Sequence, residues 1–237
     1  MIITPGLRKP SALGYISQDF PHNINNIIVD DLGRDEILLL ATDSGNVCAY
    51  YVESIFLALE HAKLSDESRP VNGSRIEPFF SEFVDLSAWG LAIHKFARLI
   101  AVGANTGLIT VFAFALVDST CCSSERSSPS EEFLDNYGIY KHNWLSIHDS
   151  TGFSQFSRLM PYRHRSRNTR LTYIGHNTNI PSVSFLNCEL DPNGTWMVST
   201  DIDNRVLVWK TWESHRPVNT LEFNRRQPTY LNGTSDR

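Results

Sequence analysis

The chain has 237 residues, of which 41% are hydrophobic, and a formal net charge of −5 at pH 7. This apolar content can form a sizeable core, and the small charge imbalance does not favour nucleic acid as the main partner. No segment approaches the roughly 20 apolar residues of a membrane span, and residues 1–15 lack the continuous apolar run of a signal peptide. The composition therefore indicates a soluble intracellular protein.

The spacing of the cysteines does not match a disulfide framework or a zinc site. They are Cys48, Cys121, Cys122 and Cys188. None of them has the Cys-x-x-Cys spacing, which argues for reduced thiols and against a disulfide frame or a zinc site. We expect no metal ion, no cofactor and no small-molecule substrate.

In chain order, residues 1–22 are predicted as an N-terminal extension and residues 23–116 as β-strands interrupted by one helix. The first strand–turn–strand unit runs from Ile37 to Tyr51. An apolar run leads to the turn residues 42–46, and a second apolar strand follows and ends on the aromatic Tyr50. Alternation and turn chemistry of this kind specify two antiparallel strands.

A helix is predicted at 52–64, directly after this unit. Ile55, Phe56, Leu59 and Ala62 recur at helical spacing, which is typical of an amphipathic helix on the rim or outer face. Two roles are open for it: packing against its own sheet, or docking a partner.

The second unit repeats the pattern of the first. Residues 88–93 are expected to form an inner strand, and Leu99 to Phe112 form strand, turn and strand, with Phe112 at the aromatic position. Turn residues Ser44 and Thr106 occupy the place of an aspartate in the best-marked unit described below. Any polar relay in the first two units is therefore expected to be absent or partial.

Residues 117–170 are the least regular part of the chain. The serine-rich and acidic stretch at 118–135 is predicted to be a disordered loop, and residues 137–156 could supply strands of another, weakly marked unit. A basic run follows. Its candidate patch residues are Arg163, Arg165, Arg167 and Arg170. The run could serve nuclear import or phosphate contact, or could be a solvated loop that pairs with the nearby acidic stretch.

Residues 171–224 form the best-marked unit, and residues 225–237 a C-terminal tail. From Gly175 to Trp209 the sequence reads GHNTNIPSVSFLNCELDPNGTWMVSTDIDNRVLVW, which resembles one WD repeat from end to end. The family's buried polar network maps onto His176, Ser199, Asp203 and Trp209. The predicted fold class is therefore all-β, a partial WD-repeat β-propeller of about three to four blades with a helical insertion and disordered loops.

These network residues are predicted to be structural. A neutral imidazole can donate from one ring nitrogen and accept at the other, and a buried indole N–H needs an acceptor. Histidine, serine and aspartate also form hydrolase triads, but the chain has no G-x-S-x-G nucleophile elbow. It also has no phosphate-binding glycine loop and no H-E-x-x-H metal motif. We expect no enzymatic activity and no catalytic residue.

Three segments in order carry a closer resemblance. They read ATDSGNVCAYYVESIFLALEH, WGLAIHKFARLIAVGANTGLITVF and the WD-repeat unit quoted above. The region from about Asn23 to Trp212 resembles the fungal family of WD-repeat regulators of ribonucleotide reductase gene transcription. The resemblance implies a non-enzymatic interaction scaffold, in the nucleus and/or cytoplasm, that acts through contacts with transcription machinery. The alternative is a substrate-recruiting adaptor of a cullin-type ubiquitin ligase.

The number of blades leaves the ring open. A seven-bladed ring needs on the order of 300 residues, and three clear units with one doubtful unit cannot close it. Either the chain is a fragment or its blades are completed by another copy. Exposed sheet edges invite pairing and aggregation, so we expect poor solubility of the chain alone.

Overall fold

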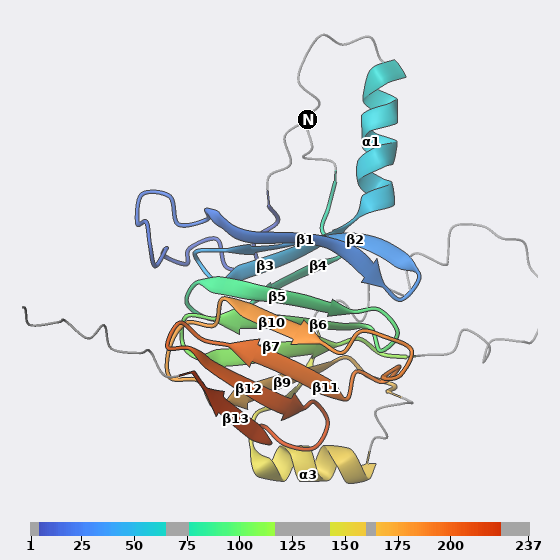
Figure 1. Cartoon of the computed structure of the whole chain (residues 1–237). Coiled ribbons are helices and arrows are strands. Elements are labelled where there is room, and N and C mark those ends of the chain that lie inside the picture. The colour runs from blue at the N-terminus through green and yellow to red at the C-terminus, as the bar shows by residue number, and fades with distance from the viewer. Residues whose placement is uncertain (1–4, 65–75, 117–142, 160–164, 224–237) are drawn as a thin grey trace, which may run out of the picture.

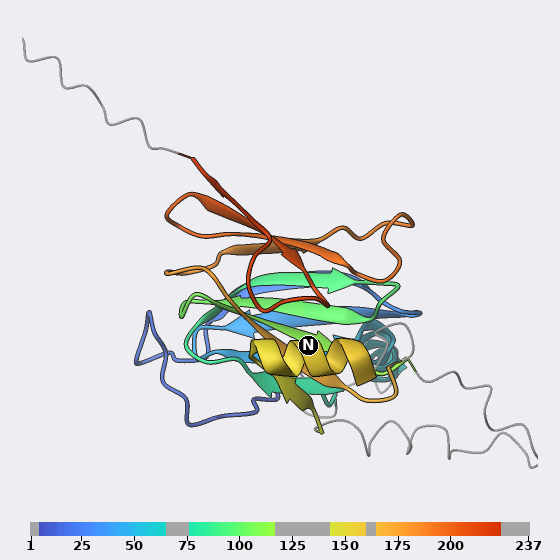
Figure 2. The ribbon, with the colours of Figure 1, turned by 90° about the horizontal axis from the view of Figure 1, so that it is seen from below.

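The computed structural model describes residues 5–64, 76–116, 143–159 and 165–223. The described residues form three β-sheets stacked one after another, with two helices at opposite ends of the stack (Figures 1 and 2). The architecture is that of consecutive propeller blades, as the sequence predicted. The serine-rich loop at 118–135 and the tail at 225–237 lie outside the described residues.

The first sheet has the order β1-β2-β3-β4, with all neighbours antiparallel. Its strands are β1 (Ile24–Leu32), β2 (Asp35–Thr42), β3 (Asn46–Tyr51) and β4 (Phe80–Phe83). Helix α1 (Val52–Leu64) leaves the end of β3 and stands away from the stack (Figure 1). The predicted helix at 52–64 is confirmed.

The second sheet has the order β5-β6-β7-β9-β8, in which only β8 and β9 are parallel. Its strands are β5 (Ala88–His94), β6 (Leu99–Ala104), β7 (Leu108–Ala113), β8 (Leu145–Ile147) and β9 (Thr169–Ile174). Helix α3 (Ser150–Leu159) joins β8 to β9. Residues 143–156 thus supply one short strand and most of a helix, so the prediction of a further blade at 137–156 is wrong.

The third sheet has the order β10-β11-β12-β13 and is antiparallel throughout. Its strands are β10 (Ser182–Phe185), β11 (Trp196–Thr200), β12 (Arg205–Lys210) and β13 (Asn219–Glu222). The first three match the strands predicted for the WD-repeat unit. The sequence pattern did not mark β13, because all four of its residues are exposed and give no alternation.

One turn conformation recurs in the three sheets, between the second and third strands of each. Gly45, Gly107 and Asn204 have φ angles of +81°, +76° and +62°. Glycine adopts this left-handed region at no steric cost, and asparagine tolerates it better than most residues do. The three turns therefore set the three hairpins in the same register, and positions counted from them are structurally equivalent.

The sheets are held together by two apolar cores. Between the first and second sheets lie Leu39, Val47 and Phe112, and between the second and third lie Val111, Met197 and Trp209, all fully buried. Helix α3 closes the second core with Phe153 and Phe156. Since both faces of the second sheet are covered, it is the centre of the stack.

Candidate interaction surface

A buried chain of hydrogen bonds ties the loop before β10 to the middle of the third sheet. Trp209 donates its indole N–H to Ser199 Oγ at 2.8 Å, and Ser199 Oγ lies 2.6 Å from His176 Nε2. His176 Nδ1 lies 2.8 Å from Asp201 Oδ2. The predicted network of His176, Ser199 and Trp209 is therefore present.

The carboxylate of this network is Asp201, and the prediction of Asp203 is wrong. Asp203 is exposed, and its backbone N–H donates to Asp201 Oδ1 at 3.1 Å. Asp201 directly follows β11, so its side chain is buried beside the histidine. It also accepts hydrogen bonds from the backbone N–H and the Nε of Arg205, each at 3.0 Å.

The protonation states follow from this geometry. Burial lowers the pKa of His176 below its ordinary range, and the neighbouring Asp201 only partly offsets that effect. Burial alone would raise the pKa of Asp201, but hydrogen bonds from His176 and Arg205 outweigh it and leave this pKa lowered. The pair is a neutral imidazole and a carboxylate. His176 therefore donates from Nδ1 to Asp201 and accepts the Ser199 hydroxyl proton at Nε2.

Among the described residues, the first two sheets do not repeat the Trp–Ser–His–Asp chain at the positions equivalent to those of the third, as the sequence predicted. In the first, His22 Nδ1 lies 2.8 Å from Ser44 Oγ, which lies 3.0 Å from Thr42 Oγ1. In the second, Thr106 Oγ1 is buried without a hydrogen-bond partner among the described residues. The first sheet has a different buried carboxylate, Asp43, which accepts the Ser87 hydroxyl at 2.7 Å and the backbone N–H groups of Ile16 and Ser17 at 2.7 and 3.1 Å.

The three arginines of the basic run that the structure describes, Arg165, Arg167 and Arg170, do not form an exposed patch. Arg163 lies outside the described residues, and Arg167 is exposed. Arg165 is 1% exposed, donates to Ala97 O at 2.5 Å and to Phe114 O at 3.1 Å, and lies 4.8 Å over the Trp212 ring. Burial lowers the pKa of Arg165 to about 9, and the positive charge of Arg98 adds to this effect, which still leaves the guanidinium charged at neutral pH.

Arg170 is also part of the structure. It is half-buried in β9, donates to Phe83 O at 3.1 Å and lies 5.5 Å over the Phe112 ring. The prediction of a basic patch is wrong for Arg165 and Arg170, because each bonds backbone carbonyls and covers an aromatic ring. The sequence shows where the positive charges are along the chain. It does not show which guanidinium group donates hydrogen bonds to backbone carbonyls inside the fold.

The inner strands of the three sheets border one groove. β1, β5 and β10 are each the first strand of their sheet, so each has an edge that faces the groove. The groove has a volume of about 330 Å³. Its lining residues are Ile28, Val29, Asp30, Leu91, Ala92, Ile93, Val183, Ser184, Phe185 and Asn187. Leu91, Ala92, Ile93, Val183 and Phe185 are buried, and the exposed lining residues are Val29, Asp30, Ser184 and Asn187, so the groove has mixed polarity. Strand edges beside such a groove suit an extended peptide segment.

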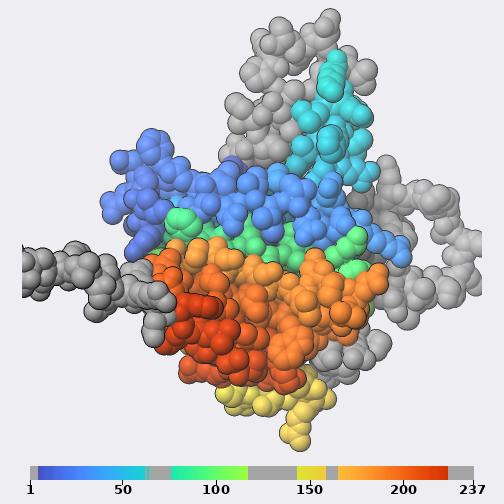
Figure 3. All heavy atoms as spheres, in the orientation of Figure 1, coloured from blue at the N-terminus to red at the C-terminus, as the bar shows by residue number. Residues whose placement is uncertain are grey.

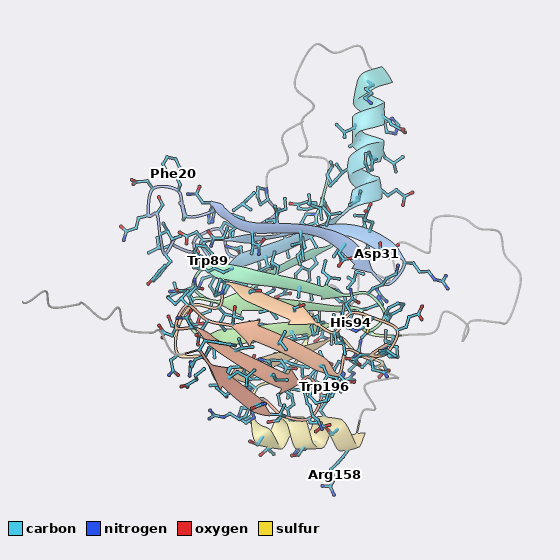
Figure 4. All side chains as sticks on the ribbon, in the orientation of Figure 1. Phe20, Asp31, Trp89, His94, Arg158 and Trp196 are labelled. Carbon is cyan, nitrogen blue, oxygen red and sulfur yellow. The ribbon has the colours of Figure 1, made fainter. Side chains whose placement is uncertain are left out.

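A second open surface lies on the outer side of the third sheet, which forms a broad uncovered area in Figure 3. We call it the third-sheet face. Its apolar members are Leu186, Trp196, Val198, Val206, Val208 and Leu221. Trp196 is labelled there in Figure 4, and it and Val198 are 39% and 41% exposed. A contiguous apolar area of this kind is typical of an interaction site.

Of the two roles that the sequence left open for helix α1, the structure shows packing against its own sheet. Ile55 and Ala58 pack against the first sheet, whereas Phe56 and Leu57 are 60% and 49% exposed.

The described residues contain no helix that is long and apolar enough to cross a membrane. They also contain no cluster of three or more histidine, cysteine, aspartate or glutamate residues that could hold a metal ion.

Stacked antiparallel sheets with recurring left-handed turns and a buried Trp–Ser–His–Asp chain define a WD-repeat protein of the β-propeller class. The chain belongs to the CRT10 family, whose model matches residues 7–216. No curated protein matches the chain.

Two similar solved structures are titled "Structure of U3-55K" and "Crystal structure of RRP9 WD40 repeats". Each is 13% identical to this chain, with a TM-score of 0.46. The match covers 86% of this chain and 40% of the other chain in both cases. The present chain thus spans less than half the length of these proteins.

The buried network predicts that Asp201 and Asp203 contribute very differently to the free energy of unfolding. Asp201→Ala should lower the free energy of unfolding by about 3 to 5 kcal/mol, because it leaves the His176 N–H and the Arg205 guanidinium without their acceptor. Asp203→Ala, at an exposed position, should change it by less than about 0.5 kcal/mol. Urea unfolding followed by tryptophan fluorescence measures both. Equal effects of the two substitutions would contradict the assignment of Asp201.

Arg165 and Arg167 should also differ in their contribution to stability. Arg165→Ala should destabilise the fold by roughly 2 to 4 kcal/mol, because the carbonyls of Ala97 and Phe114 lose their donor in a buried site. Arg167→Ala should be near neutral. Thermal unfolding of both variants, compared with the unchanged chain, tests this. A stable Arg165→Ala protein would restore the interpretation of the run as a surface patch.

Stability should fall on mild acidification. Burial lowers the pKa of both His176 and His94, so below the ordinary histidine pKa of about 6.5 the unfolded chain takes up protons that the folded chain does not. The free energy of unfolding should therefore be constant above about pH 7 and decrease toward pH 5, by at most about 1.4 kcal/mol per pH unit for each histidine. Urea titrations at several pH values measure the slope.

The matched control for this pH dependence is His94→Gln. Its slope between pH 7 and 5 should be smaller than that of the unchanged chain, because one of the two buried imidazoles is gone. A flat profile in the unchanged chain would show that neither histidine resists protonation.

Proposed function

We propose that this chain is a non-enzymatic interaction scaffold that regulates transcription of ribonucleotide reductase genes through protein contacts in the nucleus. The observation that carries the proposal is the match to the CRT10 family over residues 7–216. The match includes all three sheets except β13, so the propeller blades themselves are what the chain shares with the family.

The buried network supports a structural role for the residues that could suggest catalysis. Ser199 is 1% exposed, and its oxygen is bonded to both Trp209 and His176. A nucleophile must reach a substrate, and this hydroxyl lies between two strands and a loop. The set of His176, Ser199 and Asp201, which resembles a hydrolase triad, therefore holds the third sheet together.

The groove along the inner strands is the surface that we assign to the regulatory partner. One strand from each of the three sheets, β1, β5 and β10, lines it, so it exists only when the blades are assembled. Val29 is 55% exposed and Asp30 is exposed beside it. A groove bordered by strand edges, with Val29 and the Asp30 carboxylate exposed beside it, suits an extended protein segment that carries a positive charge.

The test uses the tagged full-length protein at its normal level in its own cells. Ribonucleotide reductase transcripts are measured after depletion and after re-expression, and bound proteins are identified by mass spectrometry. We expect the transcripts to change on depletion, and transcription or chromatin factors to be recovered. Re-expressed Val29→Arg, in the groove, should neither restore the transcript level nor recover these factors. The control Val218→Arg, at a position 48% exposed outside the groove, should do both.

Other outcomes would replace the proposal. Recovery of a cullin scaffold with unchanged transcripts would favour the ubiquitin-ligase adaptor. Unchanged transcripts with neither class of partner would refute a regulatory role for the chain.

A further inference from the structure

One stripe of helix α1 is not used for packing on its own sheet. It consists of Glu53, Phe56, Leu57 and Glu60, which are spaced three and four residues apart and are all exposed. Residues with this spacing lie on the same side of a helix. Phe56 and Leu57 are 60% and 49% exposed, although both are large and apolar. The packing of α1 on the first sheet therefore leaves this stripe uncovered.

The stripe borders a groove of about 370 Å³, which we call the α1 groove. Its other wall is the β1–β2 hairpin, above which α1 rises (Figure 1), and Tyr51 and Val52 also line it. The hairpin is anchored to the second sheet. Its Gly33 N–H donates to Lys95 O at 2.9 Å, and Asp31 accepts a hydrogen bond from Lys95 Nζ at 2.6 Å. Since both walls are held by the fold, a ligand does not have to order them.

The rim of the α1 groove is acidic. Its lining includes the carboxylates of Asp35 and Glu36 on the hairpin and of Glu53 and Glu60 on the helix, together with the guanidinium of Arg34. All five side chains are exposed. Within the described part of the chain, none of these carboxylates takes part in an ion pair. The groove therefore favours a ligand that brings both apolar side chains and positive charges.

The α1 groove suits a helical ligand better than an extended one. An extended peptide gains affinity by pairing with a free strand edge, whereas a helix has its backbone hydrogen bonds already made. β2 is paired with β1 up to the hairpin turn, and with β3 as far as the pair Ile37–Tyr51. Asp35 and Glu36 extend beyond that pair, but two residues are too few for strand addition. A helix that lies along α1 needs no such edge.

The described part of a second copy of this chain does not offer a suitable helix. α1 itself carries the carboxylates, so two copies would repel each other at this position. α3 contains one basic residue, Arg158, and its large aromatic side chains, Phe153 and Phe156, are buried in the second core. A helix that combines exposed apolar and basic residues therefore comes from a different protein.

We propose that the α1 groove is the docking site of a basic amphipathic helix of a partner protein. Glu53 and Glu60 are two helical turns apart, about 10 Å along α1, so the partner helix would carry lysine or arginine residues seven positions apart. Between them it would place two large apolar residues on Phe56 and Leu57. The carboxylates of the hairpin would attract further basic residues beside this stripe. This docking is independent of the transcriptional role proposed above and of the groove along the inner strands.

The first test is site-specific photocrosslinking in the tagged full-length protein in its own cells. A photoreactive benzoylphenylalanine replaces Phe56, and the adducts are mapped by mass spectrometry. We expect the adducts to fall on one segment of a different protein, with basic residues seven positions apart around a pair of large apolar residues. The same probe in place of Phe96, which is 47% exposed between β5 and β6, should not give this adduct.

The second test measures the contribution of charge with the purified full-length protein. The crosslinked segment is made as a fluorescent synthetic peptide, and its dissociation constant is measured by fluorescence anisotropy. Glu60→Arg should weaken binding at least about tenfold, because it places like charges opposite each other. The matched control Glu189→Arg, at an exposed position outside the groove, should leave binding unchanged. A peptide whose facing basic residue is replaced by glutamate should bind Glu60→Arg at least about tenfold more tightly than it binds the unchanged protein.

These readouts separate loss of docking from loss of folding. Glu60 is an exposed helix position, so Glu60→Arg should keep the unfolding midpoint of the unchanged protein. Adducts on a second copy of this chain or on an acidic segment would overturn the proposal, as would the absence of adducts from position 56. A crosslinked peptide that gains no helical circular dichroism in the complex would also overturn it. So would equal effects of the two arginine substitutions on peptide binding.

Discussion

Burial of the second sheet on both faces is the constraint on which the rest of the structure depends. Its central strand, β7, places Phe112 toward the first sheet and Val111 toward the third, and both side chains are fully buried. Fully burying each such side chain contributes roughly 1.5 to 3 kcal/mol. Neither neighbouring sheet has an equivalent second partner, so each depends on the second sheet for the core that it shares.

Polar groups then fix how the sheets are oriented in that stack. The loop before β10 enters between the second and third sheets and is held by His176 to Asp201 and by Ile180 O to the Gly90 N–H. Arg165 joins the ends of β6 and β7 to Trp212 below the third sheet. Apolar burial has no direction, whereas these buried hydrogen bonds are lost if a sheet slides or rotates.

The stack is therefore asymmetric. The first sheet is covered on its outer side by residues 6–9, α1 and Ile76, whereas the third sheet has an uncovered apolar face. The groove along the inner strands needs all three sheets, so it belongs to the assembled blades and to no single repeat. A scaffold of this form offers two surfaces of different chemistry: a groove bordered by strand edges, and a flat apolar sheet.

Sequence by itself determined the hairpins, the α1 helix and most of the buried network. Turn residues with positive φ and alternating apolar strands act over a few neighbouring positions, so Gly45, Gly107 and Asn204 marked their turns without knowledge of the fold. His176, Ser199 and Trp209 were found through the spacing of one repeat. Only the tertiary structure decided between Asp201 and Asp203, because both lie in the same turn and burial selects the one that faces the histidine.

The same limit applies to the remaining differences. Arg165 and Arg167 are two residues apart and chemically identical, yet one is buried on carbonyls of distant strands and the other is exposed. β8 pairs with β9, and α3 packs on Trp212. The local sequence of β8 and α3 did not indicate this packing, because both partners come later in the chain. Local propensity is determined by neighbours in sequence, whereas burial, protonation and the open face are determined by which segments pack together in space.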